Sequence, residues 1–309
     1  MEQNPDYRKI SPGKVRQKLT NAEDLVLIDT LTADHFSRVH IDGAVNACVF
    51  EVLFTENVKK ISQDKNKEII VYGSSNKSMY AVTAAEKLAR EGYRNVSAME
   101  GGLKQWVALG FAVVGEDPTF SESAKQHPKL IDHNYAVDVA ESRIEWIGRN
   151  PNTTHYGTLG LSKGEITVKN GQIGGSFEID MKAIKNINLE GDPLQPVLIR
   201  HLMSDDFFFV KMFPTATFTI TSAKSINEAI SSESNVEVQG ILALRGVKKD
   251  IHFLANASGE QCGEVKIEAH FDIDRTRWGV IYGSTRFFEN LGMHLVFDSI
   301  TIHLRLIAK

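Results

Sequence analysis

The chain has 309 residues, of which 42% are hydrophobic and 24% are charged, and its formal net charge is −4. This length exceeds the roughly 100 to 200 residues of a common domain, so we expect two domains, each with enough apolar residues for a core. Because the net charge is slightly negative, the chain offers no positive electrostatic field to attract the phosphates of nucleic acid, so we do not expect nucleic acid as a partner.

The beginning of the chain and its cysteines bear on where the protein acts. Residues 1–6 are polar and acidic and lack the basic flank and apolar core of a secretory signal. No run approaches the roughly 18 to 20 apolar residues that cross a bilayer. The two cysteines, Cys48 and Cys262, lie far apart, which fits a reducing compartment better than a disulfide framework. We therefore expect a cytoplasmic protein without a transmembrane segment.

The first hundred or so residues alternate short apolar runs with segments of helical spacing. Continuous apolar runs of this length predict strands buried on both faces, as in a parallel sheet. In chain order we expect a strand at 25–28, a strand at 68–72, a helix within 78–91 closed by Gly92, a strand at 95–99 and a helix at 103–109. The sequence thus predicts an α/β domain over residues 1–115 and, from its turn residues, a linker over 116–133.

From residue 134 to the end the apolar residues recur with a period of two, which is typical of strands with one buried face. The alternating segments are 177–180, 216–221, 236–244, 251–255, 265–273 and 300–306, with two more starting near Asn134 and Tyr156. A helical interruption, Leu194 to Ser204, separates the third strand from the fourth. Roughly eight antiparallel strands can close into a small barrel, so we expect a β-barrel over residues 134–309.

Three segments of the first domain carry a family pattern, and a loop departs from it. The segments are Leu25-Val26-Leu27-Ile28-Asp29, His40-Ile41-Asp42-Gly43-Ala44-Val45-Asn46 and Gly101-Gly102-Leu103-Lys104-Gln105-Trp106, followed by Gly110. On these residues the domain resembles the rhodanese family over nearly its whole length. The resemblance implies a thiolate after the central strand, where loop amides lower its pKa. Gly73 stands there instead.

The whole loop departs from the family pattern. It reads Gly73, Ser74, Ser75, Asn76, Lys77 and Ser78, and it is about one residue shorter than the family's loop. Lys77 replaces the usual arginine, and Leu31 stands where relatives carry another arginine. We therefore expect a degenerate domain without sulfurtransferase activity.

Two residual roles of the first domain are open on the sequence alone. Cys48 could replace the missing nucleophile, but we favour a buried small hydrophobe, since free cysteine is among the most buried residue types. Ser74, Ser75 and Lys77 could line an anion site formed by loop amides. We favour the alternative in which Ser75 or Asn76 caps the following helix.

The second domain carries a pattern from end to end. It includes Tyr135-Ala136-Val137-Asp138, Ser142-Arg143-Ile144-Glu145-Trp146, His155-Tyr156-Gly157, Gly174 to Met181, His201 to Phe208, Phe213 to Phe218, Gly240 to Lys249 and Asp274 to Gly279. On these residues the domain resembles the YceI-like family of lipocalin-like barrels. The resemblance implies binding of a polyisoprenoid lipid.

In a closed barrel the apolar faces line the interior, which is either filled by side chains or open to one elongated ligand. Both alternatives fit the pattern. The candidate lining residues are Trp146, Phe177, Ile179, Phe218, Leu242, Phe253 and Phe271. In the long segment from Arg275 to Arg286 we expect Arg275, Trp278 and Tyr282 to contact a phosphate or quinone head group, the alternative being a solvated connection.

Metal binding is not expected from the histidines. The second domain contains His155, His201, His252, His270, His294 and His303, and no pair has the close spacing with a third ligand that marks a zinc site.

The preferred hypothesis is a binding protein without a cofactor of its own. The barrel sequesters a long apolar isoprenoid or quinone-like lipid, and the first domain serves as a docking or anion-recognition module for a protein partner. A homodimer is left open. The alternative is an enzyme or sensor in which the rhodanese-like loop keeps an anion site that acts with the barrel-bound lipid. A third interpretation, an inert barrel and loop with interactions at unidentified surfaces, fits the same pattern.

Overall fold

The structure is a computed structural model that describes residues 7–118, 130–226, 232–259 and 263–309. Cys262 and residues 119–129 of the expected linker lie outside the described residues. The chain divides into two compact units, Met1–Glu122 and Ser123–Lys309, and each unit is described by itself.

The first unit alternates strands and helices in chain order. They are β1 (Arg8–Ile10), α1 (Pro12–Thr20), β2 (Leu25–Asp29), α2 (Ala33–Arg38), β3 (His40–Ile41), β4 (Val45–Asn46), α3 (Phe54–Ile61), β5 (Glu68–Tyr72), α4 (Tyr80–Arg90), β6 (Val96–Met99), α5 (Gly102–Ala108) and β7 (Val113–Val114). The order β1-β6-β5-β2-β4 forms a parallel sheet, and β3 pairs with β7 in a small antiparallel ribbon. The predicted parallel-sheet α/β domain is confirmed.

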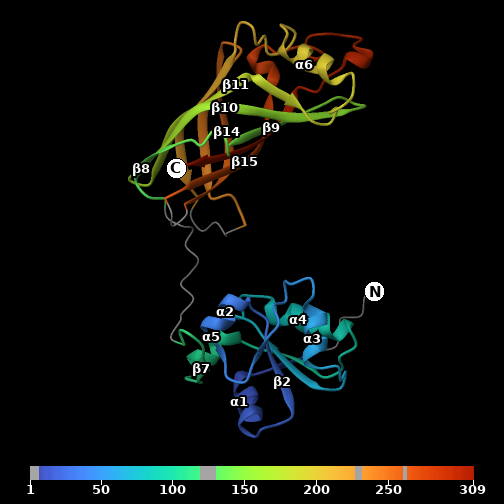
Figure 1. Cartoon of the computed structure of the whole chain (residues 1–309), viewed down its shortest axis with the longest axis vertical. Helices are drawn as coiled ribbons and strands as arrows, with labels where there is room; N and C mark the ends of the chain where they lie inside the picture. Colours follow the sequence, from blue (N-terminus) through green and yellow to red (C-terminus); the bar gives the residue numbers. More distant parts are fainter. Residues whose placement is uncertain (1–6, 119–129, 227–231, 260–262) are drawn as a thin grey trace. The chain divides into compact units, whose positions relative to one another are not determined.

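Both faces of this sheet are covered by helices (Figure 1). Ile69 and Val71 of the central strand β5 pack in one core together with residues of α3 and α4. Ile70 and Tyr72 point to the other face and pack with residues of α1 and α5. Because both sets of side chains are fully buried, the strand is a continuous apolar run rather than an alternating one.

The second unit consists of long strands with one α-helix in the described part. Its elements are β8 (His133–Ala136), β9 (Arg143–Arg149), β10 (Thr154–Lys169), β11 (Gln172–Asn186), α6 (Gln195–Met203), β12 (Thr215–Ser225), β13 (Val236–Leu244), β14 (Val247–Gly259), β15 (Val265–Asp274), η1 (Arg275–Trp278), η2 (Gly292–His294) and β16 (Ser299–Ala308).

Eight of these strands form a closed antiparallel barrel. The order runs β11-β12-β13-β14-β15-β16-β9-β10, and a further pairing between β10 and β11 closes the ring. The remaining strand, β8, pairs with the end of β10. The predicted eight-stranded barrel is thus confirmed, with one correction. The strand expected to start near Asn134 is two strands, separated by a turn at Asp138, whose carboxylate accepts hydrogen bonds from the N–H groups of Ala140 and Glu141.

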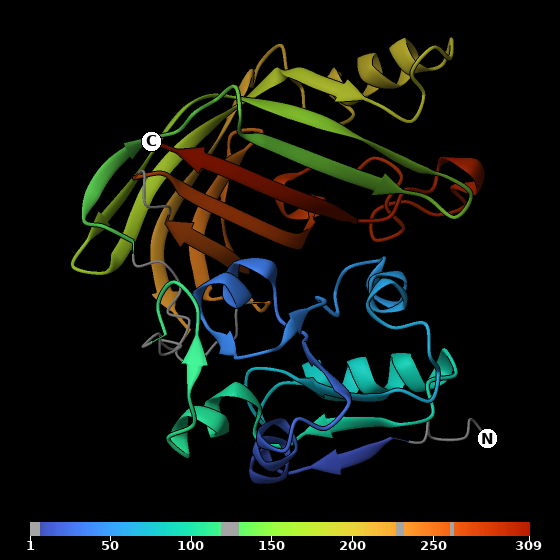
Figure 2. The same ribbon diagram turned by 60° about the horizontal axis from the view of Figure 1, so that its bottom comes forward.

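The helix α6 lies between the third and fourth barrel strands, as expected, with Pro196 in its first turn, where no hydrogen-bond donor is needed. Figures 1 and 2 show α6 at the same end of the barrel as the segment that connects β15 to β16. Among the helices in the described ranges, none is long and apolar enough to cross a membrane.

Candidate functional site

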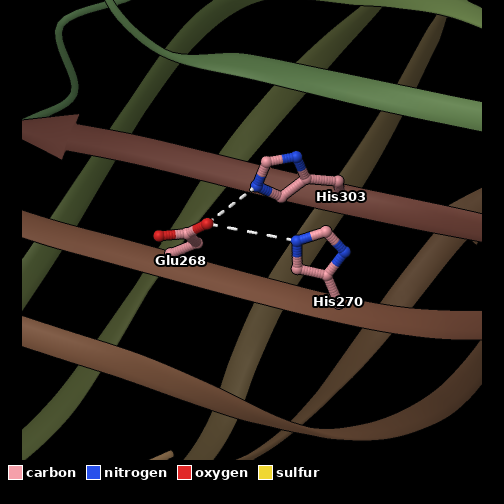
Figure 3. Close-up of side chains that lie close together, drawn as sticks. All are labelled: Glu268, His270 and His303. Carbon is pink, nitrogen blue, oxygen red and sulfur yellow. Dashed lines mark hydrogen bonds and ion pairs between the residues drawn. The ribbon is translucent and has the colours of Figure 1, made fainter. Parts of the chain in front are cut away.

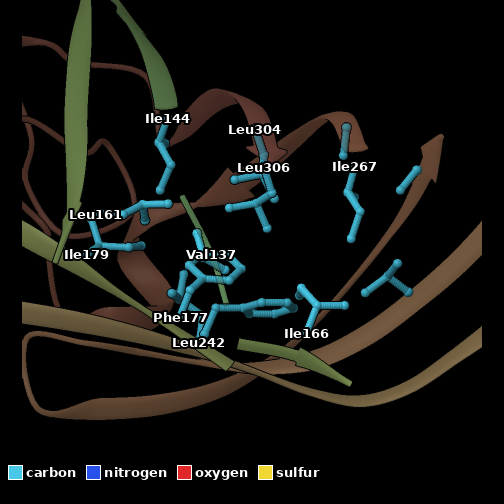
Figure 4. Packing of buried hydrophobic residues seen from close by; sticks show 14 of the residues in the cluster. Val137, Ile144, Leu161, Ile166, Phe177, Ile179, Leu242, Ile267, Leu304 and Leu306 are labelled. Carbon is cyan, nitrogen blue, oxygen red and sulfur yellow. The ribbon is translucent and has the colours of Figure 1, made fainter. Parts of the chain in front are cut away.

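The barrel encloses a cavity of about 280 Å³ with mainly apolar walls. Nine of the ten predicted ligand-binding residues line it, namely Trp146, Phe177, Ile179, Phe218, Leu242, Phe253, Phe271, Arg275 and Tyr282. Figure 4 shows several of these inward side chains packed together, among them Phe177, Ile179 and Leu242. Because a cavity remains between these inward side chains, they do not completely fill the barrel interior.

Aromatic rings form the floor of this cavity. The ring centroids of Phe177 and Phe218 lie 5.4 Å apart, those of Phe218 and Phe253 lie 5.7 Å apart, and Phe253 stacks on Phe271 at 4.2 Å. Gly240 makes room for this layer, since a Cβ atom there would collide with the ring of Phe218. Beyond the layer lies a second void of only about 20 Å³, which shares three of these four rings as walls.

The opposite end of the cavity is formed by the predicted β15–β16 segment together with α6 and the turn after it, which the sequence did not identify as part of the site. The helix α6 contributes Leu198 and Leu202, and the turn after it contributes Phe207. Met293 and Phe297 from the β15–β16 segment also line the cavity while being 88% and 44% exposed. Since exposed side chains take part in the wall here, this end is the mouth. The spacing of apolar residues within α6 could have indicated that one face of this helix packs on the cavity.

Polar side chains gather around the mouth. The hydroxyl group of Tyr282 lies 3.1 Å from Nδ1 of His294. The ring of Tyr282 also packs edge-on against His201, which in turn contacts the carboxylate of Asp206 through Nε2 at 3.1 Å. His201, His294 and Tyr282 all line the cavity. The mouth can therefore offer hydrogen bonds to a polar group at the end of an apolar ligand.

Trp146 lines the cavity with its side chain, and its indole nitrogen is buried. Trp146 is 7% exposed, and its Nε1–H is among the few buried side-chain groups of the described residues that have no hydrogen-bond partner. An unpaired buried donor costs about 1 to 3 kcal/mol. A ligand that places an oxygen beside this nitrogen would recover that free energy.

Arg275 lines the cavity, and three of its five N–H groups donate to backbone carbonyl groups. The guanidinium donates to the carbonyl oxygens of Val280 (2.7 Å), Val296 (3.0 Å) and Phe297 (3.1 Å), and it is 1% exposed. Burial lowers the pKa of this group, whereas the neighbouring Asp298 opposes the shift. The arginine thus holds the segment that forms the mouth, and its contact with a head group stays a prediction.

The prediction for Trp278 needs a correction. Its side chain is fully buried and does not line the cavity. The Nε1–H group donates to the carbonyl oxygen of Leu242 at 2.9 Å, and the guanidinium of Arg277 covers the ring. The mixture of arginine and aromatic residues suggested a loop that binds the head group of a lipid. Instead, the ring of Trp278 anchors the loop to the barrel.

In the first unit, the loop from Gly73 to Ser78 is tied to its surroundings. The side-chain oxygen of Asn76 accepts the N–H of Gly101 at 2.6 Å, and that of Ser75 accepts the N–H of Lys77 at 3.2 Å. The helix α4 begins only at Tyr80, after Met79, without a side-chain cap. The prediction that Ser75 or Asn76 caps this helix is therefore wrong, because a turn from Ser75 to Ser78 intervenes.

Gly73 and Cys48 are the two positions that we considered for a nucleophile from the sequence. Gly73 is buried, and a Cβ atom there would lie 2.5 Å from Cβ of Tyr80, so any side chain at this position requires a shift of α4. Cys48 is free and 6% exposed, in agreement with its interpretation as a buried small hydrophobe.

One cluster on the outer face of the barrel was missed entirely. Glu268, His270 and His303 offer ligand atoms that all lie within 4.8 Å of one another. Because His303 is on a different strand from the other two, only the strand register reveals the cluster.

The fold and cavity define a closed antiparallel barrel with an apolar interior, preceded by a parallel-sheet α/β unit. The model of the YceI-like domain matches residues 135–308, and the model of the rhodanese-like domain matches residues 11–109. The chain therefore belongs to the YceI-like family and carries a rhodanese-like domain in its first unit.

Individual relatives match one unit each. The uncharacterized protein YibN of Escherichia coli strain K12 is 29% identical over 97 residues, which are 31% of this chain. The match spans 66% of the length of that curated relative. Among solved structures, BcnA of Burkholderia cenocepacia is 18% identical, with a TM-score of 0.44, over 56% of this chain and 99% of that chain. A polyisoprenoid binding domain from Saccharophagus degradans is 15% identical, with a TM-score of 0.43, over 57% and 97%.

Proposed function

We propose that the barrel binds and carries one apolar lipid of the isoprenoid or quinone-like type. The observation that carries this proposal is the cavity of about 280 Å³ with mainly apolar walls, closed by an aromatic floor and open at a mouth with polar groups. Ligand pockets in proteins have this character, an apolar lining with a few polar groups that fix the orientation. A cavity of about 280 Å³ is slightly smaller than the roughly 300 Å³ at which their range begins.

The free energy of moving a lipid tail into the barrel favours a role as a lipid carrier. Moving an apolar tail from water into the barrel gains about 0.8 kcal/mol per methylene group, so a long tail would soon reach the affinity ceiling near 20 kcal/mol. The donor of such a lipid is a membrane, and relative to hydrocarbon the gain is close to zero. The protein would therefore exchange its lipid with membranes, with selectivity set by the length of the cavity and by the mouth.

The unpaired Nε1–H of Trp146 supports a ligand with an oxygen acceptor near its polar end. A quinone-like carbonyl meets this requirement, whereas a pure hydrocarbon does not. The hydroxyl group of Tyr282 and the ring of His294 would contact the same end of the ligand.

A substitution that fills the cavity tests the proposal. Ala216 on β12 lines the cavity beside Ile179, its neighbour on β11, so Ala216→Phe places a ring in the ligand's space at a cost in stability of about 1 to 3 kcal/mol. We expect it to weaken binding of a fluorescent isoprenoid quinone at least about tenfold, or about 1.4 kcal/mol. The matched control is Thr219→Phe, which adds the same ring at an exposed position on the same strand. Equal affinities of both variants would contradict the proposal.

For the rhodanese-like unit we propose a docking role without sulfur transfer. Its large apolar side chains are exposed next to the degenerate loop, with Phe50 at 70%, Val52 at 98% and Met79 at 64% exposed. The ring of Phe50 packs against Tyr80, the first residue of α4. Such a patch is suited to a protein partner. We expect no thiosulfate sulfurtransferase activity in the purified protein, and a measurable turnover would argue for the enzyme alternative. A cytoplasmic site of action remains part of this proposal.

A further inference from the structure

The outer wall of the barrel carries two histidines and a glutamate side by side, away from the interior cavity (Figure 3). Glu268 and His270 alternate along β15 with the buried Ile267 and Ala269, so both point outward. His303 stands directly opposite His270 in the antiparallel pairing of β15 with β16. The strand register thus brings all three side chains onto one patch of the surface.

The distances between the nitrogen and oxygen atoms of this patch suit coordination of one metal ion. Nε2 of His303 lies 3.1 Å from Oε1 of Glu268, and Nε2 of His270 lies 4.0 Å from the same oxygen. The two imidazole rings are stacked with their centroids 4.0 Å apart and an interplanar angle of 14°. Two ligands of a tetrahedral zinc ion, each about 2.0 to 2.1 Å from the metal, are about 3.3 Å apart. Rotation of the two imidazole rings out of their stacked arrangement would bring all three atoms onto one ion.

Glu145 on the next strand orients His303. It faces His303 in the pairing of β16 with β9, and its Oε2 lies 3.1 Å from Nδ1 of His303. The other carboxylate oxygen of Glu145 is held by Arg143 at 2.8 Å. A proton on Nδ1 of His303, donated to this carboxylate, leaves the lone pair of Nε2 directed at the patch. Histidines that bind metals usually have such a carboxylate or carbonyl partner.

We propose that Glu268, His270 and His303 bind a divalent transition-metal ion of the Zn²⁺ type, with Glu145 as a positioning residue. Two imidazole nitrogens and one carboxylate oxygen form a ligand set that zinc accepts, and the fourth position is left for water or a group from outside. Glu268 and His270 are 57% and 65% exposed, so an ion can enter directly from solvent. This site is independent of the proposed lipid function.

Calorimetric titration of the full chain with Zn²⁺ tests the site. We expect one ion per chain, and His270→Gln and His303→Gln should each weaken its binding by more than about tenfold. Glu145→Gln keeps all three ligands and should weaken binding between about 10- and 100-fold. The matched control is His252→Gln, since His252 is also exposed on the outer wall and contacts a single glutamate, Glu237, at 2.8 Å. This variant should bind Zn²⁺ like the wild type.

Substitution with Co²⁺ gives a second readout that does not depend on affinity. In the wild type we expect visible d–d absorption bands of a four- or five-coordinate ion, and these bands should be lost in His303→Gln with the circular dichroism of the fold retained. The proposal is overturned if no ion binds below about 0.1 mM, or if His303→Gln binds Zn²⁺ as tightly as the wild type. It is also overturned if His252→Gln loses as much affinity as His303→Gln.

Discussion

At the scale of single residues, the unpaired indole nitrogen of Trp146 leads to a specific prediction about the ligand, namely that the ligand has an oxygen acceptor. Trp146→Phe keeps an aromatic ring in the cavity wall and removes the unpaired donor. We expect the affinity for an isoprenoid quinone to fall by about 0.5 to 1.5 kcal/mol, the net value of one hydrogen bond.

The control for this substitution is a second ligand. An isoprenoid hydrocarbon of the same length should bind Trp146→Phe as it binds the wild type, because it has no oxygen to accept the bond. An equal loss for both ligands in a fluorescence competition assay would mean that the ring, and not its nitrogen, matters.

Asp29 in the first unit predicts a dependence of stability on pH. The carboxyl group is fully buried, and this burial raises its pKa above the ordinary value of 3.8, against the hydrogen bond that Oδ1 accepts from the N–H of Leu31. The folded state then keeps the proton to a higher pH than the unfolded state. The free energy of unfolding must therefore fall as the pH rises from 3.8 through the raised pKa.

Asp29→Asn removes this titration and keeps an oxygen for the N–H of Leu31. We expect the stability difference between variant and wild type to shift in favour of the variant as the pH rises through that window, measured by calorimetric unfolding. The control is Asp42→Asn, at an exposed carboxylate of the same unit. A difference that does not change with pH would contradict this account.

At the scale of elements, the aromatic floor sets the length of the cavity. Phe177, Phe218 and Phe253 line both the void of about 280 Å³ and the void of about 20 Å³, and the ring of Phe218 contacts the other two. Phe218→Ala would join them, so the variant should prefer lipids with longer tails than the wild type does. The truncation should also destabilise the empty barrel by about 3 to 5 kcal/mol.

Tail-length preference can be measured by competition among isoprenoid quinones of different lengths. The same preference in Phe218→Ala and in the wild type would show that another element limits the tail.

The strands and the lining could be predicted because period-two alternation fixes which side chains face inward. Phe177 and Phe253 follow directly from that rule. The turn at Asp138 was missed because the alternation alone does not distinguish one irregular strand from two. The pair of His270 and His303 could not be found either, since the register between strands is a tertiary property.

The roles of Arg275 and Trp278 in the predicted β15–β16 segment could not be derived from the sequence for a different reason. Arg275 and Trp278 have side chains that can serve a ligand or the protein itself, and their types do not decide between the two. The structure gives their hydrogen bonds to backbone carbonyl groups of the same unit. Here the two side chains fasten the loop to the barrel.

At the scale of the whole molecule, the chain joins a YceI-like barrel with an open interior to a rhodanese-like unit whose loop has a buried glycine after the central strand. In the proposed division of labour, the barrel holds the lipid and the first unit selects the partner. Neither proposed role requires covalent chemistry, and we expect substitutions in one unit to leave the role of the other unchanged.

Organic extraction of the purified full chain followed by mass spectrometry shows whether the barrel carries an apolar lipid. We expect close to one isoprenoid or quinone-like molecule per chain from the wild type and from Thr219→Phe, and much less from Ala216→Phe. A wild-type protein that yields no lipid and also takes up none from vesicles containing an isoprenoid quinone would contradict the account.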